Sequence, residues 1–194
     1  MVAVNSTMLP LGTAAPGFTL RDATTGADVS LGDFDDKPVV LVMFISNHCP
    51  YVKHVAAELG RLGSEYGPQG VAIVAIGSND VESHPDDAPV RMVEFAAANG
   101  FTFPYLYDET QEVALAYRAA CTPDFFVFDT ERRLVYRGQL DGARPSNDVP
   151  VDGRDLRAAL DAALDGAPIP EPQVPSMGCN IKWKPGNAPD YFPA

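Results

Sequence analysis

The sequence contains few cysteines, few positive charges and no long apolar run. Its three cysteines, at positions 49, 121 and 179, are too few and too widely spaced for a disulfide scaffold. The formal net charge of −12 argues against a nucleic-acid partner, because phosphate backbones are held by clustered lysines and arginines. The same charge disfavours binding to an anionic membrane surface. The longest strongly apolar run, residues 39–45, is too short to cross a bilayer.

The length and the apolar content fit one folded domain. The chain has 194 residues, of which 46% are hydrophobic, enough to bury a core of ordinary size. We expect a domain over residues 1–166, followed by a proline-rich tail, residues 167–194, that packs on the same domain. Residues 1–17 lack the basic and apolar segments of a signal peptide, so the cytoplasm is the expected location. Nothing in the sequence indicates an oligomeric state.

Apolar periodicity predicts alternating strands and helices. Residues 39–46 and 71–77 are almost wholly apolar, as in strands buried on both faces. Between them Pro50 stands where a helix begins, which predicts a parallel βαβ unit. Further helices are expected between Pro89 and Gly100, over 110–119, and between Asp152 and Gly166, and a β-hairpin over 125–129 and 134–140. The fold class is therefore α/β, a three-layer domain with a mixed sheet.

Cys49 lies between a predicted strand and the helix that Pro50 opens. The N-terminus of a helix exposes unpaired N–H groups and a partial positive charge, which stabilise a thiolate relative to a thiol. Cysteines in such positions have pKa values lowered from about 8.5 toward roughly 3.5–7.5. His48, Lys53 and His54 add basic groups nearby. The alternative is a small, inert, buried side chain; the position favours a reactive thiol.

Two groups of residues invite a metal interpretation. His48, Cys49 and His54 could ligate copper or zinc. The acidic loop 80–87 could bind Ca²⁺ or Mg²⁺ weakly, but acidic residues ahead of Pro89 equally suit the N-terminus of a helix. We expect no metal site and no cofactor.

The opening segment and two later motifs resemble a known family. Residues 15–20 (APGFTL) are similar to the opening of peroxiredoxins and of TlpA-type thioredoxin-fold proteins. Residues 49–52 (CPYV) stand where thioredoxins carry their Cys-x-x-Cys motif, and Thr122-Pro123 resembles the Thr-Pro whose proline is cis and faces the active cysteine. This resemblance implies a thioredoxin-like three-layer α/β/α sandwich with a mixed sheet and an N-terminal β extension.

A narrower resemblance covers nearly the whole chain. Residues 47–53, 121–126 and 178–184 are similar to a peroxiredoxin-like subgroup of the AhpC/TSA-type redoxins. The chain departs from the motifs, because Val52 replaces the second cysteine and no Cys-x-x-Cys disulfide can form. Arg118 is a candidate for the arginine of a peroxide site, although an arginine on a short helix is more often simply exposed.

The resemblance implies roles for the three cysteines. Cys49 takes the place of the nucleophile, and Cys121, two residues before Pro123, is the preferred resolving partner. The alternative for Cys121 is a half-buried residue at the start of a strand. Cys179 is the other candidate partner if the tail lies across the domain, and otherwise it is a thiol on a segment that only packs.

The remaining candidate site residues belong to the groove around this thiol. Pro50, Thr122 and Pro123 would shape the groove for a substrate. Trp183 would either cap the cleft or anchor the tail on apolar surface.

Two functions follow. The first is a thiol–disulfide oxidoreductase or peroxiredoxin-like antioxidant protein that uses Cys49 as a nucleophilic thiolate on a disulfide-bearing protein, a small thiol or a peroxide. The second is a non-catalytic thioredoxin-fold redox sensor or interaction protein, which the missing second motif cysteine favours.

Overall fold

A seven-stranded mixed sheet forms the centre of the molecule in the computed structural model, which describes residues 3–192. The strand order is β3-β2-β6-β5-β4-β8-β9. The strands are β2 (Thr19–Asp22), β3 (Asp28–Ser30), β4 (Val39–Phe44), β5 (Val71–Gly77), β6 (Tyr105–Tyr107), β8 (Asp124–Phe128) and β9 (Leu134–Gly138). The expected α/β class with a mixed sheet is confirmed.

The centre of the sheet is the predicted βαβ unit. β4 and β5 pair in parallel, every residue of both strands is buried, and α1 (Pro50–Tyr66) connects them. Strands buried on both faces contain almost only apolar residues, which is why these two were recognisable in the sequence. The carboxyl end of β4 therefore delivers Cys49 to the N-terminus of α1.

Two antiparallel hairpins flank the parallel strands. β8 pairs with β9 in the predicted hairpin and also pairs with β4, while β2 pairs with β3 as the N-terminal β extension. The strand β6, which the sequence did not suggest, joins the extension to β5. The helix expected over 110–119 is shorter, α3 (Glu112–Ala116), because Arg118 adopts a left-handed backbone with φ of 50° that ends helical geometry.

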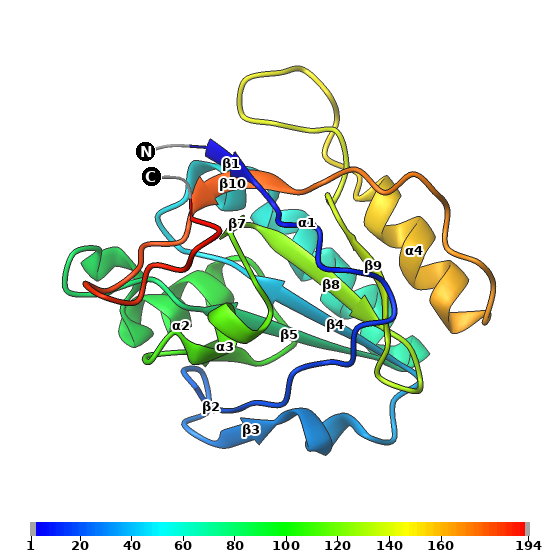
Figure 1. The fold of residues 1–194 in the computed structure, drawn as a ribbon, viewed down its shortest axis with the longest axis horizontal. Helices are drawn as coiled ribbons and strands as arrows, with labels where there is room; N and C mark the ends of the chain where they lie inside the picture. Colours follow the sequence, from blue (N-terminus) through cyan, green and yellow to red (C-terminus); the bar gives the residue numbers. More distant parts are fainter. Residues whose placement is uncertain (1–2, 193–194) are drawn as a thin grey trace.

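Helices and chain segments cover the two faces of the sheet. Buried side chains of α1, α2 (Pro89–Ala98) and α4 (Arg154–Leu164) share one apolar core with one face. The opposite core contains α3, the N-terminal segment and Ile181 of the tail. Figure 1 shows the N-terminal segment crossing in front of the sheet while α1 lies behind it. None of the helices within residues 3–192 has the length and apolar character to cross a membrane.

A second, three-stranded sheet joins the two ends of the described chain. β10 (Met177–Asn180) lies between β1 (Ala3–Asn5) and β7 (Cys121–Thr122) and is antiparallel to both. In Figure 1 the blue β1 and the orange β10 lie side by side above the main sheet. The tail is therefore held by backbone pairing beside the segment that contains Cys121 and Pro123.

Candidate functional site

Cys49 is the N-cap residue of α1. Its backbone is extended, with φ of −65° and ψ of 122°, and Pro50 follows as the first helical residue, where a missing N–H is harmless. The side chain is completely buried, with 0% of its area exposed. The predicted position of the thiol at a helix N-terminus is confirmed, but the thiol does not face open solvent.

Cys49 contacts the chain segment before Pro123. Its Sγ donates to the backbone oxygen of Thr122 at 3.1 Å, across 73 residues of sequence. The peptide bond between Thr122 and Pro123 is cis, as the family resemblance implies. Pro50 follows Cys49 as the first residue of α1, and Pro123 follows Thr122, whose carbonyl the Cys49 sulfur contacts.

Cys179 is the second sulfur at this site. It stands directly opposite Thr122 in the antiparallel pair of β10 and β7, and it belongs to the same core as Cys49. The pKa of Cys49 is lowered to about 5, and the largest cause is a hydrogen bond from the Cys179 thiol. Burial acts in the opposite direction. Smaller lowering effects come from the Thr122 side chain and from the backbone amides of Val52 and Cys179. The same hydrogen bond and burial raise the pKa of Cys179. The two opposite pKa shifts therefore favour the anion on Cys49 over the anion on Cys179.

Cys121 lies close by but in a different environment. It neighbours Thr122 in β7, and successive side chains of a strand point to opposite faces, so it does not share the side of Thr122 and Cys179. Its Sγ donates to the backbone oxygen of Pro123 at 3.5 Å. Burial and the nearby carboxylate of Asp124 raise its pKa. Cys121 is thus a buried, neutral thiol.

A buried carboxylate, Asp87, orders the three residues ahead of Cys49. It accepts hydrogen bonds from the backbone N–H of Asn47 at 2.7 Å and from Nδ1 of His48 at 2.6 Å. Asn79 donates to it at 2.7 Å as well. Burial alone would raise the pKa of Asp87, but the hydrogen bonds from His48 and Asn79 outweigh it and lower the pKa. No sequence pattern distinguishes this role, because Asp87 is one of several acids in the loop 80–87.

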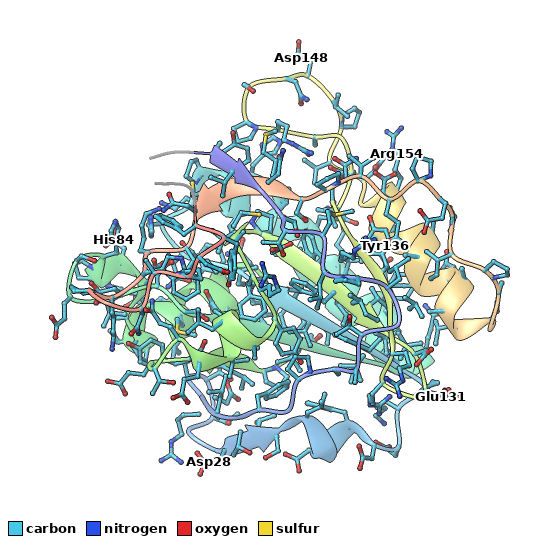
Figure 2. The ribbon with its side chains drawn as sticks, viewed as in Figure 1. Asp28, His84, Glu131, Tyr136, Asp148 and Arg154 are labelled. Atoms are coloured by element: carbon cyan, nitrogen blue, oxygen red, sulfur yellow. The ribbon has the colours of Figure 1, made fainter. Side chains whose placement is uncertain are left out.

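The rest of that loop is more peripheral. His84 stacks on His48 with ring centroids 4.9 Å apart. Figure 2 shows His84 at the outer edge of the molecule, in the loop ahead of α2. Burial lowers the pKa of His84, assisted by the charges of His48 and Lys182.

The accessory residues predicted from the sequence do not all meet at the sulfur. Lys53 and His54 lie on the exposed side of α1. Trp183 packs against the core on the far face of the sheet, which matches the anchoring alternative for this residue. The guanidinium of Arg118 lies 4.6 Å over the ring of Tyr191, on an exposed part of the chain.

The residues considered for metal binding are separated. His48 is engaged with Asp87, while His54 is exposed on α1. Within residues 3–192, no group of three or more histidine, cysteine, aspartate or glutamate side chains is arranged to hold a metal ion. What the site offers chemically is a pair of sulfurs, one of which has a lowered pKa.

A buried cysteine between a strand and a helix, in contact with the residue before a cis-proline, defines the class of thioredoxin-fold thiol proteins. The fold is shared with a thiol:disulfide interchange protein DsbE from Chlorobium tepidum, with a TM-score of 0.63 and 22% identity over 80% of this chain and 99% of that chain. Residues 11–137 match the AhpC/TSA family, and the chain belongs to this family.

Three relatives show what the chain is similar to. An uncharacterized conserved protein from Geobacillus kaustophilus has a TM-score of 0.94 and 56% identity, over 96% of this chain and 98% of that chain. A Mycobacterium tuberculosis protein provisionally named a peroxiredoxin is 31% identical over 59% of this chain and 67% of its own length. The thiol–disulfide oxidoreductase ResA of Halalkalibacterium halodurans is 27% identical over 64% of this chain and 65% of its own length. The family is thus one of thiol-dependent oxidoreductases.

Proposed function

We propose that this protein is a thiol–disulfide oxidoreductase in which the sulfur of Cys49 is the nucleophile. The observation that carries the proposal is the hydrogen bond from Cys179 to a sulfur at the N-terminus of α1, which keeps Cys49 anionic at neutral pH. A thiolate, and not a thiol, attacks disulfides and peroxides. The proposed substrates are a disulfide-bearing protein or a small disulfide.

The proposed first step is a thiol–disulfide exchange. The Cys49 thiolate attacks one sulfur of the substrate disulfide, the substrate S–S bond breaks, and a mixed disulfide forms between Cys49 and one half of the substrate. The other half leaves as a thiolate and takes a proton from solvent. The Val52 amide at the start of α1 and the Thr122 side chain favour negative charge on Cys49, so they stabilise the thiolate that makes this attack.

Disulfide exchange is favoured over peroxide reduction by the neighbours of the thiol. Arg118, the candidate arginine of a peroxide site, lies over Tyr191 and is exposed, whereas Cys49 is buried. The cation that interacts with Cys49 and Cys179 is the half-buried Lys182. Peroxide reduction is therefore a second arm of the same test.

The test compares wild type with Cys49→Ser. Wild-type protein is expected to accelerate the reduction of a small aromatic disulfide by a dithiol, and Cys49→Ser to return the rate to that of the uncatalysed reaction. Ser64→Ala, a hydroxyl removed from an exposed position of α1, is the matched control and retains the wild-type rate. Consumption of hydrogen peroxide is measured in parallel.

Equal rates for wild type and Cys49→Ser with both oxidants would overturn the proposal and favour a non-catalytic redox sensor. Peroxide consumption without disulfide reduction would reassign the protein to the peroxiredoxin-like antioxidant activity. The cytoplasm, where such thiols stay reduced, is kept as the proposed location.

A further inference from the structure

β10 brings Cys179 to Cys49 from the far end of the sequence. The strand pairs with β7 so that Cys179 stands opposite Thr122, and the Thr122 carbonyl accepts a hydrogen bond from the sulfur of Cys49. Both thiols are buried, with exposed fractions of 0% for Cys49 and 3% for Cys179. Neither is in a disulfide, and a hydrogen bond joins the two side chains.

The tail is anchored on both sides of β10. Ahead of it, the Ser176 hydroxyl donates to the backbone oxygen of Gly138 at 2.6 Å. Behind it, the Lys182 backbone N–H donates to Asn79 at 2.8 Å, and the Lys182 carbonyl accepts from the Asp80 N–H at 2.8 Å. These contacts fix the position of Cys179, so the fold itself places Cys179 next to Cys49.

We propose that Cys179 is the second redox cysteine of this protein, held against Cys49 by β10, and that the two close a reversible disulfide. The proposal rests on the proposed function and adds the partner thiol that the absent Cys-x-x-Cys motif leaves open. It differs from the expectation that Cys121 resolves Cys49. The Cys121 side chain lies on the other side of β7, and its thiol donates a hydrogen bond to the Pro123 carbonyl.

In the proposed second step, Cys179 resolves the mixed disulfide. In the mixed disulfide, the Cys179 sulfur attacks the Cys49 sulfur, the bond between Cys49 and the substrate breaks, and the substrate leaves as a thiolate that takes up a proton. Cys179 gives its proton to solvent or to that thiolate. Overall the two protein thiols are oxidised to one disulfide and the substrate disulfide is reduced to two thiols; an external dithiol then restores the protein.

The electrostatics of the pair suit this order of events. While Cys49 is an anion, the hydrogen bond to it is the main reason that the Cys179 proton is held tightly. Once Cys49 is in a mixed disulfide it is neutral, and that cause disappears. The charge of Lys182 then favours the Cys179 thiolate.

Gly178 provides a way to disturb the strand without touching either sulfur. A Cβ at this position would lie 1.9 Å from the backbone oxygen of Thr122 and 2.6 Å from its carbonyl carbon, so Gly178→Ala must push β10 away from β7. A Cβ at Gly67, at the end of α1, would meet nothing within 4 Å, and its φ of −52° suits alanine. Gly67→Ala is therefore the matched control.

The decisive experiment is peptide mapping of wild-type protein by mass spectrometry under non-reducing conditions, after one equivalent of oxidised glutathione. We expect loss of two thiols and a Cys49–Cys179 cross-link, and the same cross-link in Cys121→Ser. Cys179→Ser is expected to stop at a glutathione adduct on Cys49. In Gly178→Ala the cross-link yield falls and alkylation of Cys49 by iodoacetamide becomes about tenfold faster, because overpacking of this kind favours the open strand.

A Cys49–Cys121 cross-link in wild type would overturn the inference, as would a lasting adduct on Cys49 with Cys179 still free. In both cases Cys49 would still be the reactive thiol, and the proposed function would stand. A wild type in which Cys49 never reacts would overturn the proposed function itself. The wild-type map needs no variant, so a poorly folded Cys179→Ser does not affect it.

Discussion

The sulfur of Cys49 lies 3.1 Å from the carbonyl oxygen of Thr122, and Thr122 stands opposite Cys179 in the strand pair of β7 and β10. The Thr122 carbonyl can accept a hydrogen bond only from neutral Cys49, whereas Cys179 donates to its anion. The hydrogen bond from Cys179 outweighs the one to the Thr122 carbonyl, because the helix N-terminus and the Thr122 side chain also lower the pKa of Cys49.

The first prediction concerns this balance. The thiolate absorbance of Cys49, taken as wild type minus Cys49→Ser, is expected to titrate with a midpoint at about 5. In Cys179→Ala the midpoint moves up, because the hydrogen bond that lowers the pKa most is removed. Cys121→Ser keeps the wild-type midpoint. A wild-type midpoint near that of a free thiol, about 8.5, would contradict the assignment of the anion to Cys49.

The depressed pKa of Cys49 also has a consequence for stability. The pKa of Cys49 is lower in the folded state than in the unfolded state. Ionised Cys49 therefore contributes its full stabilisation at pH values above the unfolded pKa, and this contribution is lost as the pH falls through about 5.

The second prediction concerns Asp87. Asp87→Asn removes the charge that accepts from Asn47 and His48, and hydrogen bonds to charged groups contribute about 1.5–3 kcal/mol each. We expect a loss of roughly 2–3 kcal/mol in the free energy of unfolding, measured with urea at neutral pH. Asp86→Asn is the control, because the Asp86 side chain is exposed and only its backbone oxygen accepts from Asn47.

The pH dependence of this effect has a defined sign. The pKa of Asp87 is lowered in the fold, so its stabilising contribution is present at neutral pH and is lost as the pH falls through the folded pKa. Wild type and Asp87→Asn should therefore converge in stability at acid pH. A constant difference down to the pH where Asp87 is protonated would contradict this account.

The third prediction concerns Asp124, which is buried where β8 begins. Burial raises its pKa to about 7, and its Oδ2 accepts from the Ala120 N–H at 3.3 Å. A raised native pKa means that the protonated form stabilises the fold, so this contribution is lost as the pH rises from about 4 toward 7, at up to about 1.4 kcal/mol per pH unit.

Asp124→Asn should flatten that slope, since an amide carries no titrating proton. The measurement is the urea midpoint at several pH values between 4 and 8, compared with Asp165→Asn, an exposed carboxylate at the end of α4. Parallel curves for wild type and Asp124→Asn would show that Asp124 is ionised throughout.

The fourth prediction concerns the packing of α1. A Cβ at Gly60 would lie 2.0 Å from the backbone oxygen of Asn99, which follows α2. Alanine gains up to about 1 kcal/mol over glycine inside a helix, but a contact with backbone at this distance forces α1 and the loop apart. We expect Gly60→Ala to lower the free energy of unfolding by about 1–3 kcal/mol, and Gly67→Ala to change it by less than about 0.5 kcal/mol. An increase in stability for Gly60→Ala would contradict this packing.

By itself the sequence determined the parts of the protein that depend on neighbouring residues. The apolar runs at 39–46 and 71–77 predicted β4 and β5, and Pro50 after Cys49 predicted a cysteine at a helix N-terminus. These features follow from local patterns, because burial on both faces requires continuous apolar residues and a helix start tolerates proline.

Only the tertiary structure decided which sulfur meets Cys49 and how far the site is closed. The contact with Cys179 depends on the pairing of β10 with β7, and the role of Asp87 on hydrogen bonds to residues about 40 positions earlier in the chain. Neither leaves a periodic pattern in the sequence, because each depends on contacts between segments that are far apart in the chain. The burial of Cys49 also depends on distant segments, since it shares its core with Cys179 of β10 and with residues of several other elements.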